Sequence, residues 1–171
     1  LFSSVVPKKF ILIKSFVQKK FKTKCIELKN LNFSKIMKVK VDKKQIGSDR
    51  LANSIAVISK TNNFIILDFG TATTFDVVIK NVYYGGVIAP GLNISLETLS
   101  KKAKLIPLVR LKKIQKVIGT NTVAAVRSGF FWGYIGLIDN IIKLIKMETK
   151  QSFKIIVTGG FSSFFKKKFK S

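Results

Sequence analysis

Residues 64–76 read FIILDFGTATTFD, and this stretch decides the fold that the sequence predicts. The apolar residues 64–67 are typical of a buried strand, which ends at the carboxylate of Asp68. Gly70 follows, and glycine lets backbone N–H groups converge on an anion because it has no Cβ. The turn is therefore a candidate phosphate site, with a cation between the phosphate and Asp68. A capped turn without a ligand is the competing interpretation.

The segments around this strand alternate between short apolar runs and helical patterns, which favours an α/β fold. Residues 73–79 and 83–89 predict a hairpin that turns at Lys80 and Asn81. The other predicted elements are a strand over 3–6, a helix through Phe10, Ile13 and Phe16, a short strand over 24–28, a connecting segment over 29–45, a helix through Leu51, Ile55 and Ile58, a helix after Pro90 and Gly91 through Leu96 and Leu99, one long helix over 121–147, and a strand over 153–160.

Composition limits the chemistry that the chain can perform. With 171 residues, 47% of them hydrophobic, the chain can form one ordinary domain, or one domain and part of another. Cys25 is the single cysteine and there is no histidine, which excludes a disulfide framework, a multi-thiolate zinc site and Ser-His-Asp catalysis. Catalysis would have to rest on carboxylates, hydroxyls, lysines and the backbone.

The formal net charge of +24 invites a nucleic-acid interpretation, because cations release counterions when they neutralise phosphates. However, only Arg50, Arg110 and Arg127 are arginines, and arginine is the residue that base and phosphate recognition prefers. The lysines are spread through almost every segment. We therefore favour a solvated lysine surface and predict no specific nucleic-acid partner.

The most membrane-like stretch, residues 128–138, is bounded by Arg127 and Asp139. It falls well short of the roughly 20 apolar residues that a spanning helix needs. The spacing of Gly129 and Gly133 resembles a membrane dimer motif, but a tightly packed helix of a soluble protein is the favoured interpretation. We predict no membrane partner.

Two further segments combine a helix start with polar side chains. In residues 46–53, IGSDRLAN, either Ser48 or Asp49 is available to cap the first helical turn. Alternatively, Asp49 can take a proton from a hydroxyl, and Arg50 can fork onto a carboxylate or phosphate. Thr122 opens the long helix, where its hydroxyl can cap the backbone or face a ligand, and Asn121 is the competing cap.

Together these motifs resemble the type III pantothenate kinase family. The resemblance covers nearly the whole chain, in family order. The motifs are SSVVP at 3–7, IGSDRLAN at 46–53, DFGTATTFDVV at 68–78, GGVIAPGL at 85–92, SLETLSKKAKLIPLV at 95–109, IGTNTVAAVRSGFFWGYIGLID at 118–139 and VTGG at 157–160.

The resemblance implies a member of the sugar kinase, heat-shock chaperone and actin superfamily, with ribonuclease-H-like (actin-like ATPase) α/β domains and ATP between them. Residues 1–60 would be the remainder of the N-terminal domain, with the substrate segment, and residues 61–171 the C-terminal domain. The implied reaction is the ATP-dependent phosphorylation of pantothenate to 4'-phosphopantothenate, the first step of coenzyme A biosynthesis. The implied protein is a cytoplasmic homodimer that uses Mg²⁺ with ATP and a monovalent cation.

The resemblance also implies roles for individual residues, carried over by motif. Asp49 would be the general base for the pantothenate hydroxyl. The other pantothenate contacts would be Gly47, Ser48, Arg50 and Thr122. Asp68 would bind the monovalent cation, potassium or ammonium. The ATP contacts would lie in the two glycine turns; they are Gly70, Thr71, Gly159 and Gly160.

The sequence departs from the family pattern at three places. One is the short lysine-rich end after the TGG turn, where the family usually has a final strand and helix. Nothing before residue 47 matches the family's Asp-x-Gly-Asn-Thr phosphate loop, and residues 38–45 lack the tyrosine that usually precedes the GSDR segment. We therefore expect a chain that lacks the first half of the first domain. A non-catalytic nucleotide-binding or transcriptional accessory relative, or an inactive fragment, is the alternative.

The long helix carries four aromatic residues close together, which are Phe130, Phe131, Trp132 and Tyr134. They cannot all face one small core, so we predict a dimer interface there. Internal burial in a complete protein is the alternative.

Overall fold

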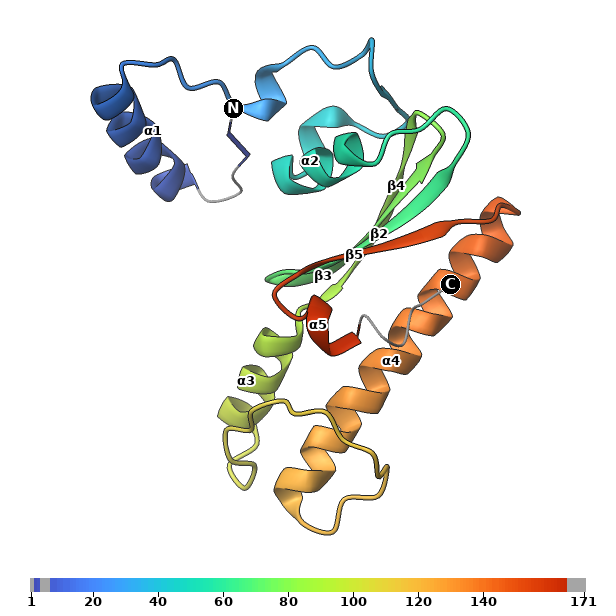
Figure 1. The fold of residues 1–171 in the computed structure, drawn as a ribbon. Helices are drawn as coiled ribbons and strands as arrows, with labels where there is room; N and C mark the ends of the chain where they lie inside the picture. Colours follow the sequence, from blue (N-terminus) through green and yellow to red (C-terminus); the bar gives the residue numbers. More distant parts are fainter. Residues whose placement is uncertain (1, 4–6, 166–171) are drawn as a thin grey trace. The chain divides into compact units, whose positions relative to one another are not determined.

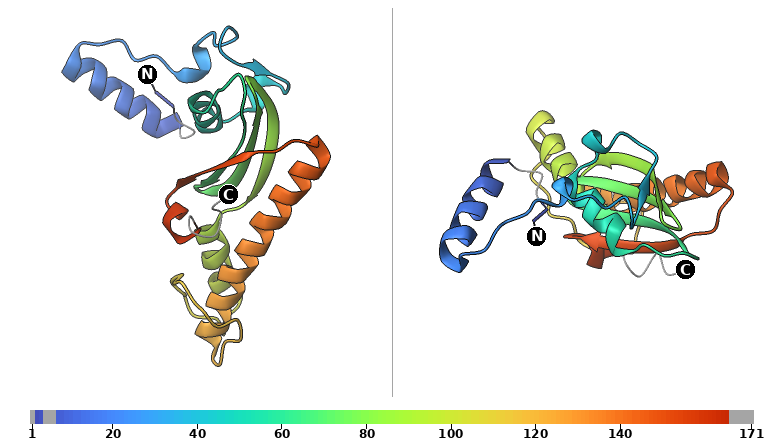
Figure 2. Two further views of the ribbon diagram at one scale, coloured as in Figure 1. Left: turned by 45° about the vertical axis from the view of Figure 1, so that its right-hand side comes forward. Right: turned by 90° about the horizontal axis from the view of Figure 1, so that it is seen from above.

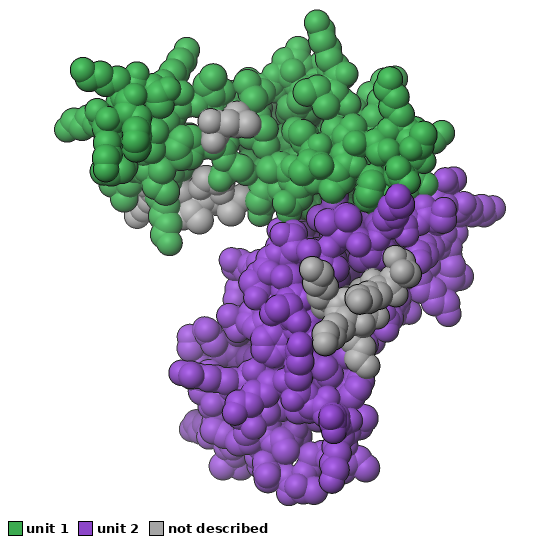
Figure 3. Space-filling model, in the orientation of Figure 1, with its two compact units in different colours: residues 1–64, 76–85 green, residues 65–75, 86–171 purple. Residues whose placement is uncertain are grey.

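The computed structural model describes residues 2–3 and 7–165, so most of the strand expected over 3–6 lies outside the described residues. The chain forms two compact units (Figure 3). Unit 1 comprises Leu1–Phe64 and Asp76–Gly85, and unit 2 comprises Ile65–Phe75 and Gly86–Ser171. The domains predicted over 1–60 and 61–171 stay a prediction.

The mixed α/β architecture is confirmed (Figure 1). A five-stranded sheet has the order β1-β4-β3-β2-β5. Its strands are β1 (Lys38–Val39), β2 (Asn63–Phe69), β3 (Ala72–Ile79), β4 (Val82–Pro90) and β5 (Lys154–Gly159). The predicted hairpin is also confirmed, because β3 and β4 are joined at Lys80, whose φ is 55°.

Strand β2 is the buried strand that the opening stretch predicts. Ile65, Ile66 and Leu67 are each at most 1% exposed. Because successive side chains of a strand point to opposite faces, three buried residues in a row mean that this part of β2 is covered on both faces. The continuous apolar run therefore places Asp68 and Gly70 at the end of a rigid, buried element.

The helices of the described residues are α1 (Pro7–Phe21), α2 (Ser48–Ala56), α3 (Leu92–Lys102), α4 (Thr122–Thr149) and α5 (Ser162–Phe165). The first four lie close to the predicted positions, whereas α5 was not predicted. Helix α2 ends at Ala56, so Ile58, which was predicted to continue its apolar stripe, lies beyond it. Lys150 follows α4 in the left-handed conformation, and the chain reverses there into β5 (Figure 2).

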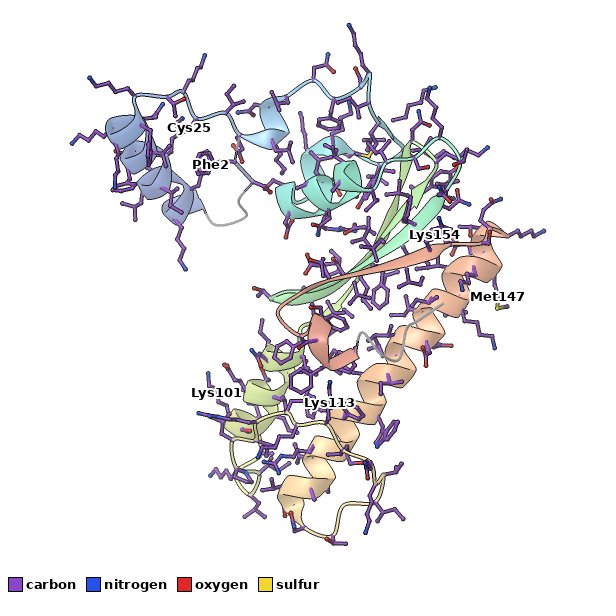
Figure 4. All side chains as sticks on the ribbon, in the orientation of Figure 1. Phe2, Cys25, Lys101, Lys113, Met147 and Lys154 are labelled. Carbon is purple, nitrogen blue, oxygen red and sulfur yellow. The ribbon has the colours of Figure 1, made fainter. Side chains whose placement is uncertain are left out.

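The strand predicted over residues 24–28 is wrong. Only an isolated parallel bridge joins Glu27 to Phe2, and a 3-10 helix, η1 (Leu28–Asn30), follows at once. Cys25 is instead buried against α1, with its Sγ 3.9 Å from the Lys14 carbonyl oxygen (Figure 4). Among the described residues this segment has a single pairing position, so no ladder of hydrogen bonds forms.

The connecting segment predicted over 29–45 also contains ordered structure. A second 3-10 helix, η2 (Lys43–Gln45), begins where the Asp42 side chain accepts a hydrogen bond from the Lys44 N–H. Strand β1 pairs in parallel with β4, with Lys38 opposite Val82. Two residues are too few to show the alternation of a strand, so sequence periodicity could not reveal β1.

Helix α4 supplies much of the core of unit 2. Phe131, Tyr134 and Ile138 are buried, and the Tyr134 hydroxyl donates to the Pro90 carbonyl oxygen at 2.5 Å. No helix in the described part of the chain is long and apolar enough to cross a membrane. Among the described residues, the glycines on α4 do not mark a tight contact, because Cβ atoms placed on Gly129 and Gly133 would have no neighbouring atom within 4 Å.

Candidate active site

The first turn of α2 presents Asp49 to solvent. Gly47 occupies the N-cap position, with φ −59° and ψ 142°, and makes no side-chain cap. The helix begins at Ser48, so the prediction that Ser48 or Asp49 caps the helix is corrected. The Asp49 side chain is exposed, and its Oδ1 accepts the Arg50 backbone N–H at 2.8 Å. A carboxylate is favoured there because the helix N-terminus carries a partial positive charge.

Ser48 and Arg50 turn away from solvent. Ser48 is 1% exposed, although the resemblance makes it a pantothenate contact. The Arg50 guanidinium reaches strand β3, where Nε and Nη2 each lie 2.7 Å from Asp76 Oδ1. Arg50 therefore does fork onto a carboxylate, as its residue type predicts, but the carboxylate belongs to the chain itself.

Asp76 is the centre of a buried polar cluster in unit 1. Its side chain is fully buried, and its Oδ1 also accepts a hydrogen bond of 2.7 Å from the Tyr83 hydroxyl of β4. Hydrogen bonds to a charged group are shorter and stronger than neutral ones. Three donors, from helix α2 and strand β4, therefore converge on one oxygen of β3.

Burial controls the electrostatics of this cluster. Loss of solvent raises the pKa of Asp76, while the Arg50 charge and the hydrogen bonds from Tyr83 and Arg50 act to lower that pKa, and the Asp49 charge raises it slightly further. Burial, reinforced by the Asp76 charge and hydrogen bond, also raises the pKa of Tyr83. The Tyr83 hydroxyl therefore keeps its proton at neutral pH and serves as a donor.

In unit 2, the end of β2 meets the end of β5. Gly159 has a φ of +87°, and a Cβ added to it would lie 2.5 Å from Asp68 Oδ1 and 2.6 Å from the Phe69 nitrogen. The next residue, Gly160, donates its N–H to the Phe69 carbonyl oxygen at 3.0 Å. Only glycine fits both the conformation and the close approach at residue 159. Two predicted ATP contacts and the predicted cation ligand are therefore brought together.

A second close approach lies on the other side of the same turn. A Cβ added to Gly91, the residue before α3, would collide with the carbonyl group of Thr71. The Gly70 N–H donates to the Ala72 carbonyl oxygen at 3.1 Å, which closes the turn. Gly70 and Thr71 are exposed. The turn thus exposes the Thr71 hydroxyl, which can donate to a phosphate, while the Gly70 N–H is bonded within the turn.

The described residues contain no group of three or more acidic, cysteine or histidine side chains that could hold a metal ion. Asp68 brings one carboxylate to the Gly70–Thr71 turn, whose other oxygens belong to the backbone and to the Thr71 hydroxyl. Hard cations take oxygen ligands, so this carboxylate can contribute to a cation site.

Thr122 is the first residue of α4, and its side chain is exposed. Asn121 caps the helix, since its Oδ1 accepts the Ala124 N–H at 2.9 Å. The competing cap at Asn121 is thus confirmed. The loop before α4 borders a pocket of about 370 Å³ whose lining includes Thr120 and Arg127.

The structure thus brings together the predicted site residues at the start of α2 in unit 1, and those at the ends of β2 and β5 in unit 2. Thr122, at the start of α4, lies apart from the glycine turns (Figure 1). Sequence reasoning missed Asp76 and Tyr83. One signal was available, because Asp76 interrupts the apolar strand TTFDVVI and a buried acid needs a partner.

Comparisons with known proteins agree with these features. The family model described as type III pantothenate kinase matches residues 1–144. A type III pantothenate kinase of Pelagibacter ubique is 66% identical over 171 residues, which are the whole of this chain and 69% of that protein. One of Roseobacter denitrificans is 42% identical over 168 residues, which cover 96% of this chain and 65% of that protein.

One solved structure shows the same fold at low sequence identity. It is the crystal structure of a conserved putative Baf family transcriptional activator from Campylobacter jejuni. The TM-score is 0.57 at 20% identity, and the similarity covers 92% of this chain and 68% of that chain. At this identity the likeness concerns the fold alone.

Proposed function

Because this chain belongs to the type III pantothenate kinase family, we propose that it takes part in the ATP-dependent phosphorylation of pantothenate to 4'-phosphopantothenate, the first step of coenzyme A biosynthesis. One observation carries the proposal, the 66% identity to a type III pantothenate kinase over all 171 residues. The chain spans about two thirds of the length of that relative and of the Roseobacter denitrificans relative, so the proposal concerns the reaction to which this part contributes.

Asp49 is the proposed general base. Its carboxylate is exposed, and Oδ1 is oriented by the Arg50 N–H, so it can approach a substrate hydroxyl and accept the proton as the hydroxyl attacks phosphorus. Phosphoryl transfer needs alignment and charge neutralisation more than covalent help from the protein. The lack of histidine is therefore compatible with the reaction. Gly47, Ser48, Arg50 and Thr122 are the further proposed pantothenate contacts.

The glycine turns of unit 2 are the proposed ATP contacts, through Gly70, Thr71, Gly159 and Gly160. The exposed Thr71 hydroxyl of the Gly70–Thr71 turn supports this assignment. ATP, carried with Mg²⁺, supplies the phosphoryl group. Asp68 is the proposed ligand of a monovalent cation, potassium or ammonium, and its half-buried carboxylate lies beside Gly159, one of the proposed ATP contacts.

The finer features of the family complete the proposal: a ribonuclease-H-like, actin-like fold divided near residue 60, a cytoplasmic location and a homodimer. The exposed glycine face of α4 supports a dimer through this helix, because a second chain could approach its backbone closely. Phe131 and Tyr134 are buried within unit 2, which argues against a large aromatic interface.

Turnover by the purified 171-residue chain tests the proposal. With ATP, Mg²⁺, potassium and pantothenate, we expect 4'-phosphopantothenate, detected by mass spectrometry. Asp49→Asn should reduce the rate about 10²–10⁴-fold, the usual contribution of a general base. Asp139→Asn, which changes an exposed acid on α4, is the matched control and should keep the rate. Failure of the wild-type chain to form product, or full activity of Asp49→Asn, would contradict the proposal.

A further inference from the structure

The buried carboxylate of Asp76 and the proposed base, Asp49, are bonded to the two ends of the same residue, Arg50. Tyr83 and the Arg50 guanidinium donate to Asp76 Oδ1, each at 2.7 Å. The backbone N–H of Arg50 then donates to Asp49 Oδ1 at 2.8 Å. All four residues belong to unit 1. Arg50 therefore links a fully buried acid on the sheet to an exposed acid on the helix.

The position of Asp76 is unusual for a residue that serves stability alone. It lies between Phe75 and Val77, which are both buried, in the middle of an apolar strand. Replacing a buried ion pair with well-packed apolar residues is often neutral or stabilising, so burying this charge is a poor way to gain stability. What a buried, hydrogen-bonded charge does provide is a fixed geometry for its partners.

Arg50 is suited to transmit that geometry. The guanidinium is planar, so two N–H groups that share Asp76 Oδ1 fix both its position and its plane. Its side chain is 14% exposed, and its guanidinium is bonded to Asp76. Arg50 lies in the first turn of α2, so its bond to Asp76 attaches this turn to strand β3.

We propose that Asp76 and Tyr83 are positioning residues, which hold Arg50 and thereby fix the first turn of α2 and the direction of the Asp49 carboxylate. The inference rests on the proposed function, since it takes Asp49 as the base. Neither residue touches a substrate in this scheme. Tyr83 orients Asp76, Asp76 orients Arg50, and Arg50 orients Asp49.

The first test does not depend on turnover. The chain has three arginines, and therefore three side-chain Nε–H signals in a ¹⁵N spectrum, of which Arg50→Lys identifies one. We expect the Arg50 Nε–H to exchange with water at least about tenfold more slowly than that of exposed Arg110, because it is hydrogen-bonded and mostly buried. Asp76→Ala should remove this protection and Tyr83→Phe should reduce it. Equal exchange of Arg50 and Arg110 in the wild type would overturn the proposal.

The second test separates positioning from stability. Per folded molecule, Asp76→Ala should lower kcat about 100-fold, the scale of effect of a misplacement of about 1 Å. Tyr83→Phe, which keeps the ring in the core, should lower kcat about tenfold. The KM for ATP should stay within about twofold, because the proposed ATP contacts lie in unit 2. The KM for pantothenate should rise, because Arg50 is itself a proposed pantothenate contact, and the fall in kcat comes in addition to that rise.

Tyr84→Phe is the matched control, because it makes the same change one residue away, on a side chain that is 38% exposed and packs under Lys40. It should change neither kcat nor the exchange of Arg50. Unchanged kcat in folded Tyr83→Phe, or an equal loss in Tyr84→Phe, would overturn the inference. If the wild-type chain transfers no phosphate, the proposed function fails, while the Nε–H exchange still decides whether Asp76 and Tyr83 hold Arg50.

Discussion

The stretch DFGTATTFD has an acid at each end, and the two acids are held in different ways. Asp68, in unit 2, is half-buried near the end of strand β2, where Gly159 approaches it closely. Asp76, in unit 1, is fully buried and is fixed by the donors of Arg50 and Tyr83. One acid is placed by backbone shape and the other by charge pairing.

This difference predicts which kind of substitution destabilises each region. The glycine turn around Asp68 depends on the absence of a side chain, so the smallest possible addition damages it. The cluster around Asp76 depends on the presence of particular groups, so a deletion damages it by leaving buried donors without an acceptor. An added side-chain atom should therefore destabilise the glycine turn, and the removal of a side chain should destabilise the Asp76 cluster.

The largest expected effect is that of Asp76→Ala. It leaves the Arg50 cation and the Tyr83 hydroxyl without their buried acceptor, and should lower the free energy of unfolding by about 3–5 kcal/mol. Urea denaturation measures this change. Asp139→Ala removes an exposed acid and should stay within about 0.5 kcal/mol of the wild type. A loss below about 1 kcal/mol for Asp76→Ala would contradict the claim that Asp76 is fixed by its pairing with Arg50 and Tyr83.

The next effect is that of one added methyl group in unit 2. Gly159→Ala should lower the free energy of unfolding by about 1–3 kcal/mol, because the new Cβ would overlap Asp68 Oδ1 and the Phe69 backbone at a positive φ. Gly160→Ala is the matched control, since a Cβ there has no neighbour within 4 Å, and it should be close to neutral. Equal urea midpoints for the two variants would show that the close approach of Gly159 to Asp68 and Phe69 leaves room for a side chain.

A smaller effect tests the start of α4. Asn121→Ala removes the side-chain acceptor of the Ala124 N–H and should cost about 1 kcal/mol of unfolding free energy. Thr122→Ala, one residue on, should cost less, because Thr122 is not the cap. Thermal unfolding of both variants measures the difference. A larger loss of stability in Thr122→Ala than in Asn121→Ala would show that Thr122 is the cap.

The last prediction concerns pH and sharpens the account of Asp76. Its pKa is raised above the ordinary value of 3.8, so the folded state holds this proton more tightly than the unfolded state does. The cost of ionised Asp76 is fully present above the raised pKa and disappears below pH 3.8. Relative to Asp76→Asn, the wild type should therefore gain stability as pH falls through this window. A relative loss of stability on acidification would mean that pairing outweighs burial.

Much of the local structure could be predicted because its causes are local. The apolar run of β2, the hairpin at Lys80 and the long pattern of α4 follow from periodicity and turn residues. The strand predicted at 24–28 failed because a strand also needs a partner, and β1 was missed because its pairing with β4 is its main definition. Pairing depends on residues far away in the chain.

The sequence by itself determined the family, the α/β class and the chemical groups that the site can use. Those depend on residue identity and on short-range spacing, which the chain carries in every conformation. Only the tertiary structure decided that Arg50 turns to Asp76, that Tyr83 joins them, and that Gly159 packs against Asp68. The physical reason is that desolvation and close approach arise when distant segments meet, and a group's environment, rather than its identity, then fixes its direction and its charge.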